Sequence, residues 1–142
     1  AWCEAHDVEV CPALDDLLPL ADVVSLHLPC NETTENLICD ETLEKMKPTA
    51  ILLNTGRGGL VNEEDLYRAM KSGHLLGAGL DVFENEPNVN PAFFELDNVA
   101  LAPHMGSATE EARYAMGEKV LINMKTFADG HSPRDRVLPD GF

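Results

Sequence analysis

Short apolar runs alternate along the chain with segments in which apolar residues recur at helical spacing. The apolar runs predict β-strands over residues 7–10, 22–29, 50–54, 76–82 and 99–103. The helical spacing predicts helices over residues 13–20, 40–47, 62–73 and 107–129, with a short helical turn over 91–96. Because strand and helix patterns alternate, the sequence predicts an α/β fold with a mostly parallel sheet.

Capping residues mark the ends of several predicted helices. Asp40 and Asn62 suit N-cap positions, and Gly73 suits the left-handed position after the helix that Asn62 begins. Ser107 and Glu110 have the spacing of a capping box, which predicts the start of the long helix at Ser107. The apolar face of that helix is expected to consist of Ala112, Met116, Val120, Met124 and Phe127.

The composition narrows the classes of partner and site. The chain has 142 residues, enough for one domain, and its 25 acidic and 10 basic side chains give a net charge of −15. This charge argues against nucleic acid or an anionic membrane surface as a partner, but not against a small anionic ligand. The first residues lack the pattern of a signal peptide, and no apolar run reaches membrane-spanning length. Since the four cysteines show no CxxC spacing, we expect no metal site and a cytoplasmic location.

The stretch from Ala50 to Leu60 carries the first candidate chemistry. Its apolar run breaks into a glycine-rich turn around Arg57, which allows a sharp bend and close approach to a ligand. Arg57 is expected just past the carboxyl end of a strand, where open α/β sheets bind their ligands. Its guanidinium matches a carboxylate or a phosphate. From this stretch alone, a ligand-binding role for Arg57 is about as well supported as a structural one. In the structural explanation Arg57 is a surface loop residue or is paired to a nearby carboxylate.

Polar clusters follow three successive predicted strands. In chain order they are Arg57, then Asp81 with Glu84 and Glu86, then His104. Because the carboxyl ends of parallel strands lie side by side, these residues can share one cleft. An arginine can hold an anionic substrate, a histidine can transfer a proton near neutral pH, and a carboxylate can orient the imidazole and favour its protonated form. The sequence contains no metal-ligand spacing and no nucleophile motif such as GxSxG.

Each of these residues also has a purely structural explanation. His104 fits a histidine hydrogen-bonded to the backbone, and Asp81 fits a turn cap. Glu86 fits a solvated loop acid, which is how Glu84 is interpreted. His27 lies within a predicted strand and is expected to be structural. Taken singly, each residue favours the structural explanation, but their joint placement after separate strands shifts the balance toward a site.

Four motifs resemble the C-terminal part of the D-isomer-specific 2-hydroxyacid dehydrogenase family. In order they are His27-Leu28-Pro29 followed by Thr34, Asn54-Thr55-Gly56-Arg57-Gly58, Gly79-Leu80-Asp81-Val82-Phe83-Glu84-Asn85-Glu86-Pro87, and Pro103-His104-Met105-Gly106-Ser107. The resemblance runs from about residue 21 to the end of the long predicted helix. Within the family it is closest to glyoxylate/hydroxypyruvate reductase-like members. It implies a partial Rossmann-like, doubly wound parallel sheet with a long C-terminal helix.

The resemblance implies a role for each matching residue. Arg57 would bind the substrate carboxylate and polarise its keto oxygen. His104 would donate the proton in reduction and accept it in oxidation, with Glu86 paired to its imidazole. Asp81 would hold the nicotinamide carboxamide, and Gly56 stands where the family often has alanine or serine. The residues implied to contact the cofactor, NAD or NADP, are Pro29, Thr34, Thr55, Gly56, Arg57, Asp81, His104 and Gly106.

Two parts of the family pattern are missing from the sequence. The Gly-x-Gly-x-x-Gly turn and the residue after it that selects NAD or NADP are absent, as is the N-terminal substrate domain. We therefore expect part of a longer protein, which by itself has little or no turnover. Residues 1–106 would be the C-terminal portion of a dinucleotide-binding domain, 107–129 a long crossover helix and 130–142 an irregular tail.

The sequence leaves three functional interpretations. In the first, the complete parent enzyme transfers a hydride between NAD(P)H and a small 2-oxo acid such as glyoxylate or hydroxypyruvate. In the second, the fold is a non-enzymatic dinucleotide-sensing module like the corepressor branch that the family resembles. In the third, the chain is an inactive fragment. We favour the first interpretation, with a homodimer as the parent assembly.

Overall fold

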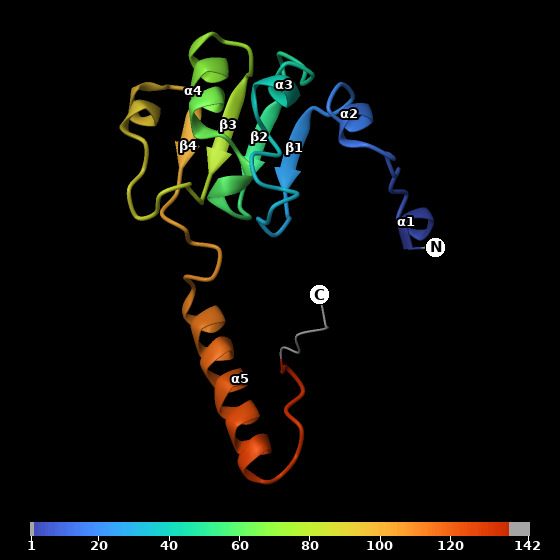
Figure 1. Ribbon diagram of the computed structural model, residues 1–142, viewed down its shortest axis with the longest axis vertical. Helices are drawn as coiled ribbons and strands as arrows, with labels where there is room; N and C mark the ends of the chain where they lie inside the picture. The colour runs from blue at the N-terminus through green and yellow to red at the C-terminus, as the bar shows by residue number, and fades with distance from the viewer. Residues whose placement is uncertain (1, 137–142) are drawn as a thin grey trace. The chain divides into compact units, whose positions relative to one another are not determined.

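The computed structural model of the protein describes residues 2–136 (Figure 1). Its strands are β1 (Val23–Leu26), β2 (Ile51–Asn54), β3 (Gly77–Leu80) and β4 (Val99–Leu101). Its α-helices are α1 (Trp2–Ala5), α2 (Leu14–Leu17), α3 (Asp40–Leu43), α4 (Glu63–Lys71) and α5 (Glu110–Ala128), and its 3-10 helices are η1 (Gly58–Leu60) and η2 (Pro91–Glu95). The chain divides into two compact units, one ending at His104 and the other beginning at Met105.

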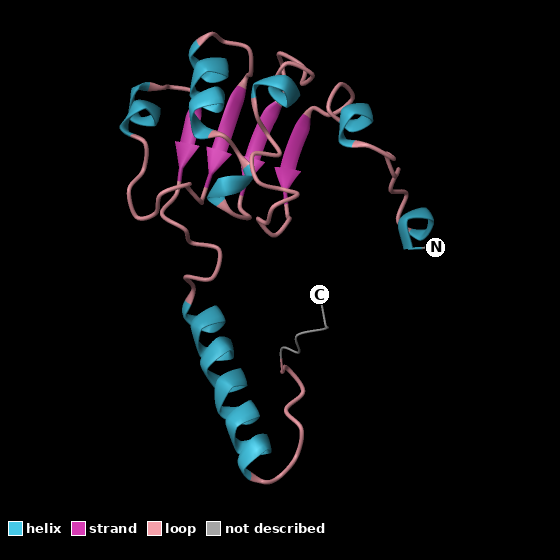
Figure 2. Cartoon of the chain, viewed as in Figure 1, coloured by secondary structure: helices cyan, strands magenta, loops and turns pink. Residues whose placement is uncertain are grey.

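The described strands form one parallel sheet in the order β1-β2-β3-β4, and their arrowheads all point the same way (Figure 2). The register pairs Val24 with Leu52, and Ala78 with both Leu52 and Val99. Each crossover between neighbouring strands passes through a helical segment, namely α3, α4 or η2. The predicted α/β class, with a parallel Rossmann-like sheet and a long C-terminal helix, is therefore confirmed.

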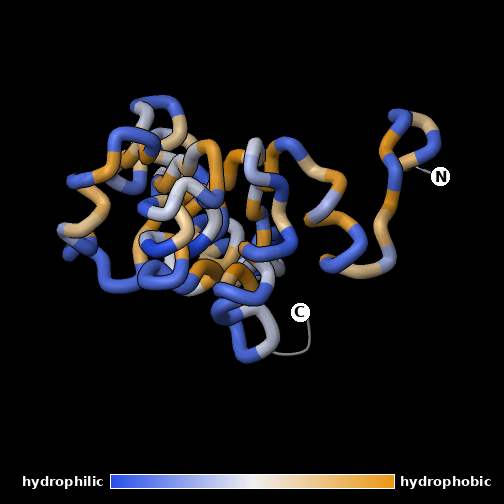
Figure 3. The backbone as a smooth tube through the Cα atoms, turned by 90° about the horizontal axis from the view of Figure 1, so that it is seen from above, coloured by the Kyte–Doolittle hydropathy of each residue, from blue (hydrophilic) through white to orange (hydrophobic). Residues whose placement is uncertain are grey.

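The core lies between the sheet and helices α3 and α4, which pack against each other. Helix α4 turns Leu66, Ala69 and Met70 into this core. In the sheet the residues alternate, so that Leu52 and Asn54 of β2 are buried while Ile51 and Leu53 are less covered. Hydrophobic and hydrophilic stretches alternate along the backbone (Figure 3). This arrangement leaves one face of the sheet more completely covered than the other.

The ends of α4 follow the predicted caps. The Asn62 side chain accepts a hydrogen bond from the backbone N–H of Asp65, which satisfies one free donor of the first turn. Gly73 follows the helix with a φ of +73°, the left-handed conformation that a glycine adopts at low cost. The short helical turn predicted near Pro91 is also present as η2.

The strand predicted over residues 7–10 is wrong. Asp7 adopts a positive φ of 54°, Val8 and Val10 are exposed, and the segment forms neither helix nor strand. A strand needs a neighbour that satisfies its backbone groups, and no described strand pairs with this segment. The apolar alternation alone was therefore a misleading signal.

Two predicted helix starts also need correction. The helix predicted over 40–47 is limited to Asp40–Leu43, with Cys39 rather than Asp40 at the N-cap. The Thr42 hydroxyl accepts the Cys39 backbone N–H at 2.8 Å, which fixes the start one residue earlier. Helix α5 begins at Glu110 with Thr109 as its N-cap, so the cap predicted at Ser107 is wrong. The Thr109 hydroxyl accepts the backbone N–H of Ala112 and supersedes Ser107 in this role.

Helix α5 ends close to the predicted position, but its apolar residues do not form one buried face. None of its residues is buried within the described chain, and apolar side chains are distributed around the helix. Residues 130–136 contain no helix or strand, and the rest of the predicted irregular tail lies outside the described residues. Among residues 2–136, no helix combines the length and apolar character needed to span a membrane.

Candidate functional site

The loops that follow the strands gather at the carboxyl edge of the sheet (Figure 1). Arg57 directly precedes η1 after β2, Glu86 lies in the loop after β3, and His104 follows β4. The three predicted catalytic residues therefore come from loops that leave three adjacent strands at the same edge. This edge is where open parallel sheets bind ligands.

Asn54, the last residue of β2, holds the turn that carries Arg57. Its side chain is only 1% exposed, donates a hydrogen bond to the Arg57 carbonyl oxygen and accepts one from the Gly56 backbone N–H. Its own carbonyl oxygen accepts the backbone N–H of Asp81, which links the ends of β2 and β3. The sequence analysis did not single out Asn54 as a positioning residue. A polar residue at the end of an apolar run, directly before a glycine turn, is the signal that could have identified it.

Gly58 brings the Arg57 turn into direct contact with the loop after β3. A Cβ atom at Gly58 would lie 1.9 Å from the Phe83 carbonyl carbon and 2.4 Å from the Glu84 backbone nitrogen. No side chain fits in this space. Glycine is required at position 58 because the two backbone segments approach so closely, and not because of its φ angle. The contact fixes Arg57 beside the loop that carries Glu86.

Glu86 and His104 form an ion-pairing hydrogen bond. His104 Nδ1 lies 2.7 Å from Glu86 Oε2, with the two side chains 45% and 36% exposed. The other carboxylate oxygen, Oε1, accepts the backbone N–H of Phe83 at 3.0 Å. The hydrogen bond to His104 is the main cause that lowers the pKa of Glu86, followed by the Phe83 N–H, and the charge of Arg57 adds to the effect. Glu86 is therefore held in its ionised form between two donors.

The hydrogen bond to Glu86 also fixes the orientation of the imidazole. Because an ionised carboxylate can only accept, His104 Nδ1 must carry the hydrogen, which leaves Nε2 as the nitrogen that can exchange a proton with a ligand. His104 has a φ of +54°, a left-handed conformation that is uncommon outside glycine. Such backbone conformations persist when the surrounding structure holds them, and they cluster at functional sites.

A groove of about 500 Å³ lies beside Arg57 at the ends of β1 and β2. It is lined by His27, Leu28, Pro29, Cys30, Thr55, Gly56 and Arg57. Four of the residues implied to contact the cofactor thus line one surface. An alanine Cβ at Gly56 would lie 3.1 to 3.3 Å from Leu60 and from two backbone oxygens, a tight but adjustable fit. His27 directly follows β1, is exposed and shares a 2.8 Å hydrogen bond with Ser25, so its expected structural role stays a prediction.

The other implied cofactor contacts are placed differently. Thr34 is not among the residues that line the groove, and its hydroxyl donates a 2.7 Å hydrogen bond to the Pro29 carbonyl oxygen, closing its own loop. Asp81 follows β3 and is partly buried. Gly106 belongs to the second unit, so its relation to the groove stays a prediction. A smaller hollow of about 390 Å³ is lined by Phe83, Glu86, Pro87, Val89, Pro103 and His104.

Residues 3–106 match the family model of the D-isomer specific 2-hydroxyacid dehydrogenase NAD binding domain. The chain belongs to this family. Glyoxylate reductase from Thermococcus litoralis is 48% identical over 126 residues, which cover 89% of this chain and 38% of the relative. Glyoxylate reductase from Korarchaeum cryptofilum is 46% identical over 143 residues, covering 95% of the chain and 43% of the relative. The chain thus spans well under half the length of these curated relatives.

Solved structures of the family superpose closely on the chain. A D-isomer specific 2-hydroxyacid dehydrogenase from Polaromonas matches 97% of the chain and 43% of its own length, with a TM-score of 0.92 and 32% identity. The NADPH-dependent glyoxylate/hydroxypyruvate reductase from Sinorhizobium meliloti, in complex with NADP and malonate, has a TM-score of 0.84 and 35% identity. That match covers 92% of the chain and 44% of the reductase. The resemblance stated from the four motifs is thereby confirmed.

The carboxylates of Glu63 and Glu84 lie next to the loop that carries Glu86. The backbone N–H of Glu63 donates to Glu84 Oε1 at 3.0 Å, and the backbone N–H of Glu84 donates to Glu63 Oε1 at 2.8 Å. Glu84 is exposed and lies in the loop after β3, as interpreted from the sequence, but its carboxylate also caps the first residue of α4. Burial is the main cause that raises the pKa of Glu63, with the Glu84 charge adding to it and the Glu84 N–H opposing it.

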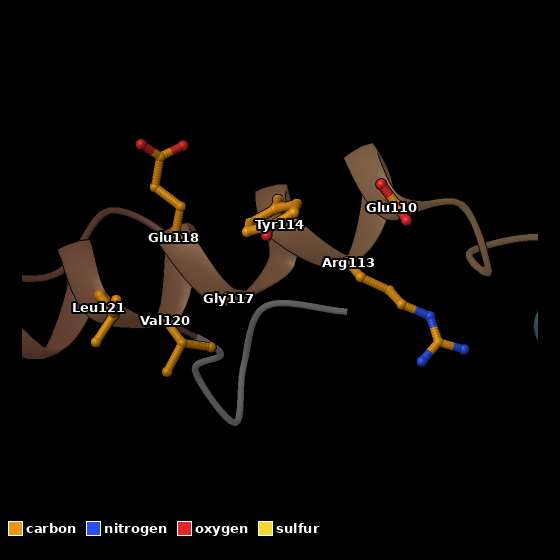
Figure 4. Close-up of a pocket in the computed structure, with 7 residues that line it drawn as sticks. All are labelled: Glu110, Arg113, Tyr114, Gly117, Glu118, Val120 and Leu121. Atoms are coloured by element: carbon orange, nitrogen blue, oxygen red, sulfur yellow. The ribbon is translucent and has the colours of Figure 1, made fainter.

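A larger hollow of about 860 Å³ lies on α5. Its lining residues all come from that one helix, and Figure 4 shows that side chains such as Glu118 and Arg113 point away from one another. Because the polar side chains of the described residues that line it do not converge, this surface lacks the feature that distinguishes a ligand site.

Proposed function

We propose that these 142 residues supply the proton-transfer and carboxylate-binding groups of a NAD(P)H-dependent reductase of small 2-oxo acids, such as glyoxylate or hydroxypyruvate. The observation that carries this proposal is the 2.7 Å hydrogen bond between His104 and Glu86 at the sheet edge that also bears Arg57. The reductase names of the relatives from Thermococcus litoralis and Sinorhizobium meliloti support the same reaction class.

Each of the three side chains has a distinct task in the proposed reduction. The Arg57 guanidinium binds the substrate carboxylate through two parallel hydrogen bonds and polarises the keto oxygen. His104 donates the proton from Nε2 to that oxygen as it becomes a hydroxyl, and accepts it in the reverse direction. Glu86 accepts the hydrogen of Nδ1 and, through its charge, stabilises the imidazolium that donates the proton.

The groove beside Arg57 fits the nicotinamide half of a dinucleotide. Gly56 leaves its floor without a side chain, and Pro29 and Thr55 supply neighbouring walls. When bound, the nicotinamide supplies the hydride to the 2-carbon or accepts it. The sequence lacks the Gly-x-Gly-x-x-Gly turn that cradles the pyrophosphate, so that half of the cofactor site is assigned to segments of the parent enzyme outside these residues.

The corepressor-type alternative is not favoured, since the curated relatives from Thermococcus litoralis and Korarchaeum cryptofilum are glyoxylate reductases. We also propose that the parent enzyme is a cytoplasmic homodimer that does not bind nucleic acid, which sedimentation of the full-length protein and fractionation of cells can test.

Reduction of glyoxylate and hydroxypyruvate by the full-length protein tests the proposed function. Oxidation of NADH or NADPH that depends on either oxo acid is the expected result. A full-length protein that binds the cofactor but reduces neither acid would contradict the proposal.

A further inference from the structure

The backbone between Phe83 and Glu84 is the point at which several contacts of the site meet. The N–H of Phe83 donates to Glu86 Oε1 at 3.0 Å, and the next N–H, that of Glu84, donates to Glu63 Oε1 at 2.8 Å. The peptide group between them lies directly against Gly58. Two carboxylates and one glycine therefore determine where this short stretch of backbone lies.

The Glu63–Glu84 pair connects this stretch to the turn that carries Arg57. Glu63 is the first residue of α4, and only η1 and two further residues separate it from Arg57. Its backbone N–H donates to Glu84 Oε1, so each glutamate holds the backbone of the other. This reciprocal pair ties the segment after β2 to the loop after β3.

The Glu63–Glu84 pair is placed to hold the two backbone segments in position, and not to supply charge to the site. Glu63 is 8% exposed and lies beside a like-charged residue, an arrangement that costs free energy. The first turn of α4 already has a local cap in Asn62, which serves the Asp65 N–H. The Glu63 carboxylate instead serves a loop 21 residues away in the chain, which is the loop that leads to Glu86.

We infer that Glu63 and Glu84 are positioning residues, whose reciprocal hydrogen bonds set the Arg57 turn at a fixed distance from the Glu86–His104 pair. This inference rests on the proposed function for its catalytic consequence. Misplacement of reacting groups by about 1 Å can cost on the order of 100-fold in rate, so a loosened pair should reduce kcat.

Two conservative substitutions at Glu84 in the full-length protein distinguish the effect of side-chain length from the effect of side-chain charge. Glu84→Gln keeps an oxygen at the same reach for the Glu63 N–H, whereas Glu84→Asp keeps the charge but shortens the side chain. We expect kcat for glyoxylate reduction to fall roughly tenfold to a hundredfold in Glu84→Asp and to stay within about twofold of wild type in Glu84→Gln. The cofactor dissociation constant should change little in either variant. The exposed neighbour Glu64, changed to Gln and to Asp, is the matched control and should behave as wild type.

The proton on His104 Nδ1 gives a readout that does not depend on turnover. Its NMR signal should be retained in Glu84→Gln and should broaden through faster exchange with water in Glu84→Asp. Equal kcat and equal signals in the two Glu84 variants would overturn the inference, as would a Glu84→Gln variant as impaired as Glu84→Asp. If the wild-type protein proves inactive, the proposed function fails, and the His104 signal still decides whether the pair positions the site.

Discussion

At the residue scale, Glu86 joins the parts of the candidate site. One of its oxygens accepts the hydrogen of His104 Nδ1 and the other accepts the backbone N–H of Phe83, while the charge of Arg57 is close enough to lower the pKa of Glu86. A single carboxylate thus orients the imidazole and anchors it to the loop after β3.

Replacing Glu86 with glutamine in the full-length protein should move the pH profile of reduction. The hydrogen bond from His104 lowers the pKa of Glu86. The Glu86 carboxylate is therefore fully ionised above the usual pKa of a glutamate, and its charge is lost only as the pH falls through the lowered pKa. At neutral pH the carboxylate therefore stabilises the imidazolium, and Glu86→Gln removes that charge. Activity in the variant should decline at lower pH than in wild type as pH rises, measured as kcat/KM against pH. A profile that overlays the wild-type profile would mean that the two residues are uncoupled.

Replacing Arg57 with lysine keeps the charge but removes the planar fork. Two hydrogen bonds to the substrate carboxylate become one, and a hydrogen bond to a charged group contributes about 1.5–3 kcal/mol. We expect kcat/KM for glyoxylate to fall about tenfold to a hundredfold. Steady-state kinetics with a matched Arg68→Lys control, at an exposed arginine on α4, check this. A variant with wild-type kcat/KM would remove Arg57 from substrate binding.

The placement of Arg57, Glu86 and His104 at one edge could be predicted because each follows a predicted strand and parallel strand ends converge. The choice of Glu86 as the partner of His104 came from the family resemblance. The sequence did not identify Asn54, Glu63 or Glu84 as positioning residues. Glu63 and Glu84 lie 21 residues apart, and each looked like an ordinary acid of a first helical turn or a loop. Their pairing depends on the close approach of two loops, which no local pattern records.

At the element scale, the placement of Arg57 relative to Glu86 depends on how the turn before η1 packs against the loop after β3. Gly58 allows this contact, with Phe83 backbone atoms where its Cβ would be. Strand positions could be predicted from apolar runs because buried parallel strands have a plain signature. The segment over 7–10 instead alternates charged and apolar residues, and no described strand pairs with it. The start of α5 depends on whether Ser107 or Thr109 reaches a free N–H. Both outcomes depend on three-dimensional context.

Replacing Gly58 with alanine should displace the two loops from each other. A Cβ 1.9 Å from the Phe83 carbonyl carbon cannot be accommodated without backbone movement, and overpacking of this kind costs about 1–3 kcal/mol. We expect a lower Tm and a loss of reductase activity in the full-length variant. Gly56→Ala, whose new Cβ would meet its neighbours at 3.1 to 3.3 Å, is the graded control and should be milder on both measures. Equal effects of the two substitutions would refute the packing argument.

At the scale of the whole molecule, the chain holds the candidate proton donor and the carboxylate-binding arginine but lacks the pyrophosphate-binding turn. It covers 38% of the length of the Thermococcus litoralis relative. Much of the anion binding in this fold comes from the glycine-rich turn and the helix that follows it. We therefore propose that the pyrophosphate-binding half of the cofactor site is supplied from outside these 142 residues.

The isolated 142-residue chain should therefore bind NADH or NADPH weakly. The groove beside Arg57 offers contacts to the nicotinamide half alone. Titration by fluorescence or calorimetry should show no saturation at micromolar cofactor, whereas the full-length protein should saturate. Micromolar affinity of the isolated chain would show that the described residues supply a pyrophosphate site of their own.

In the proposed reaction His104, held by Glu86, transfers the proton to a 2-oxo acid as it is reduced. The most direct measurement compares glyoxylate reduction by the full-length wild-type protein and by its His104→Gln variant, with cofactor binding measured in both. General acid catalysis is typically worth about 10²–10⁴-fold, so kcat should fall by about that factor while the cofactor still binds. A His104→Gln variant that reduces glyoxylate at the wild-type rate would contradict the account.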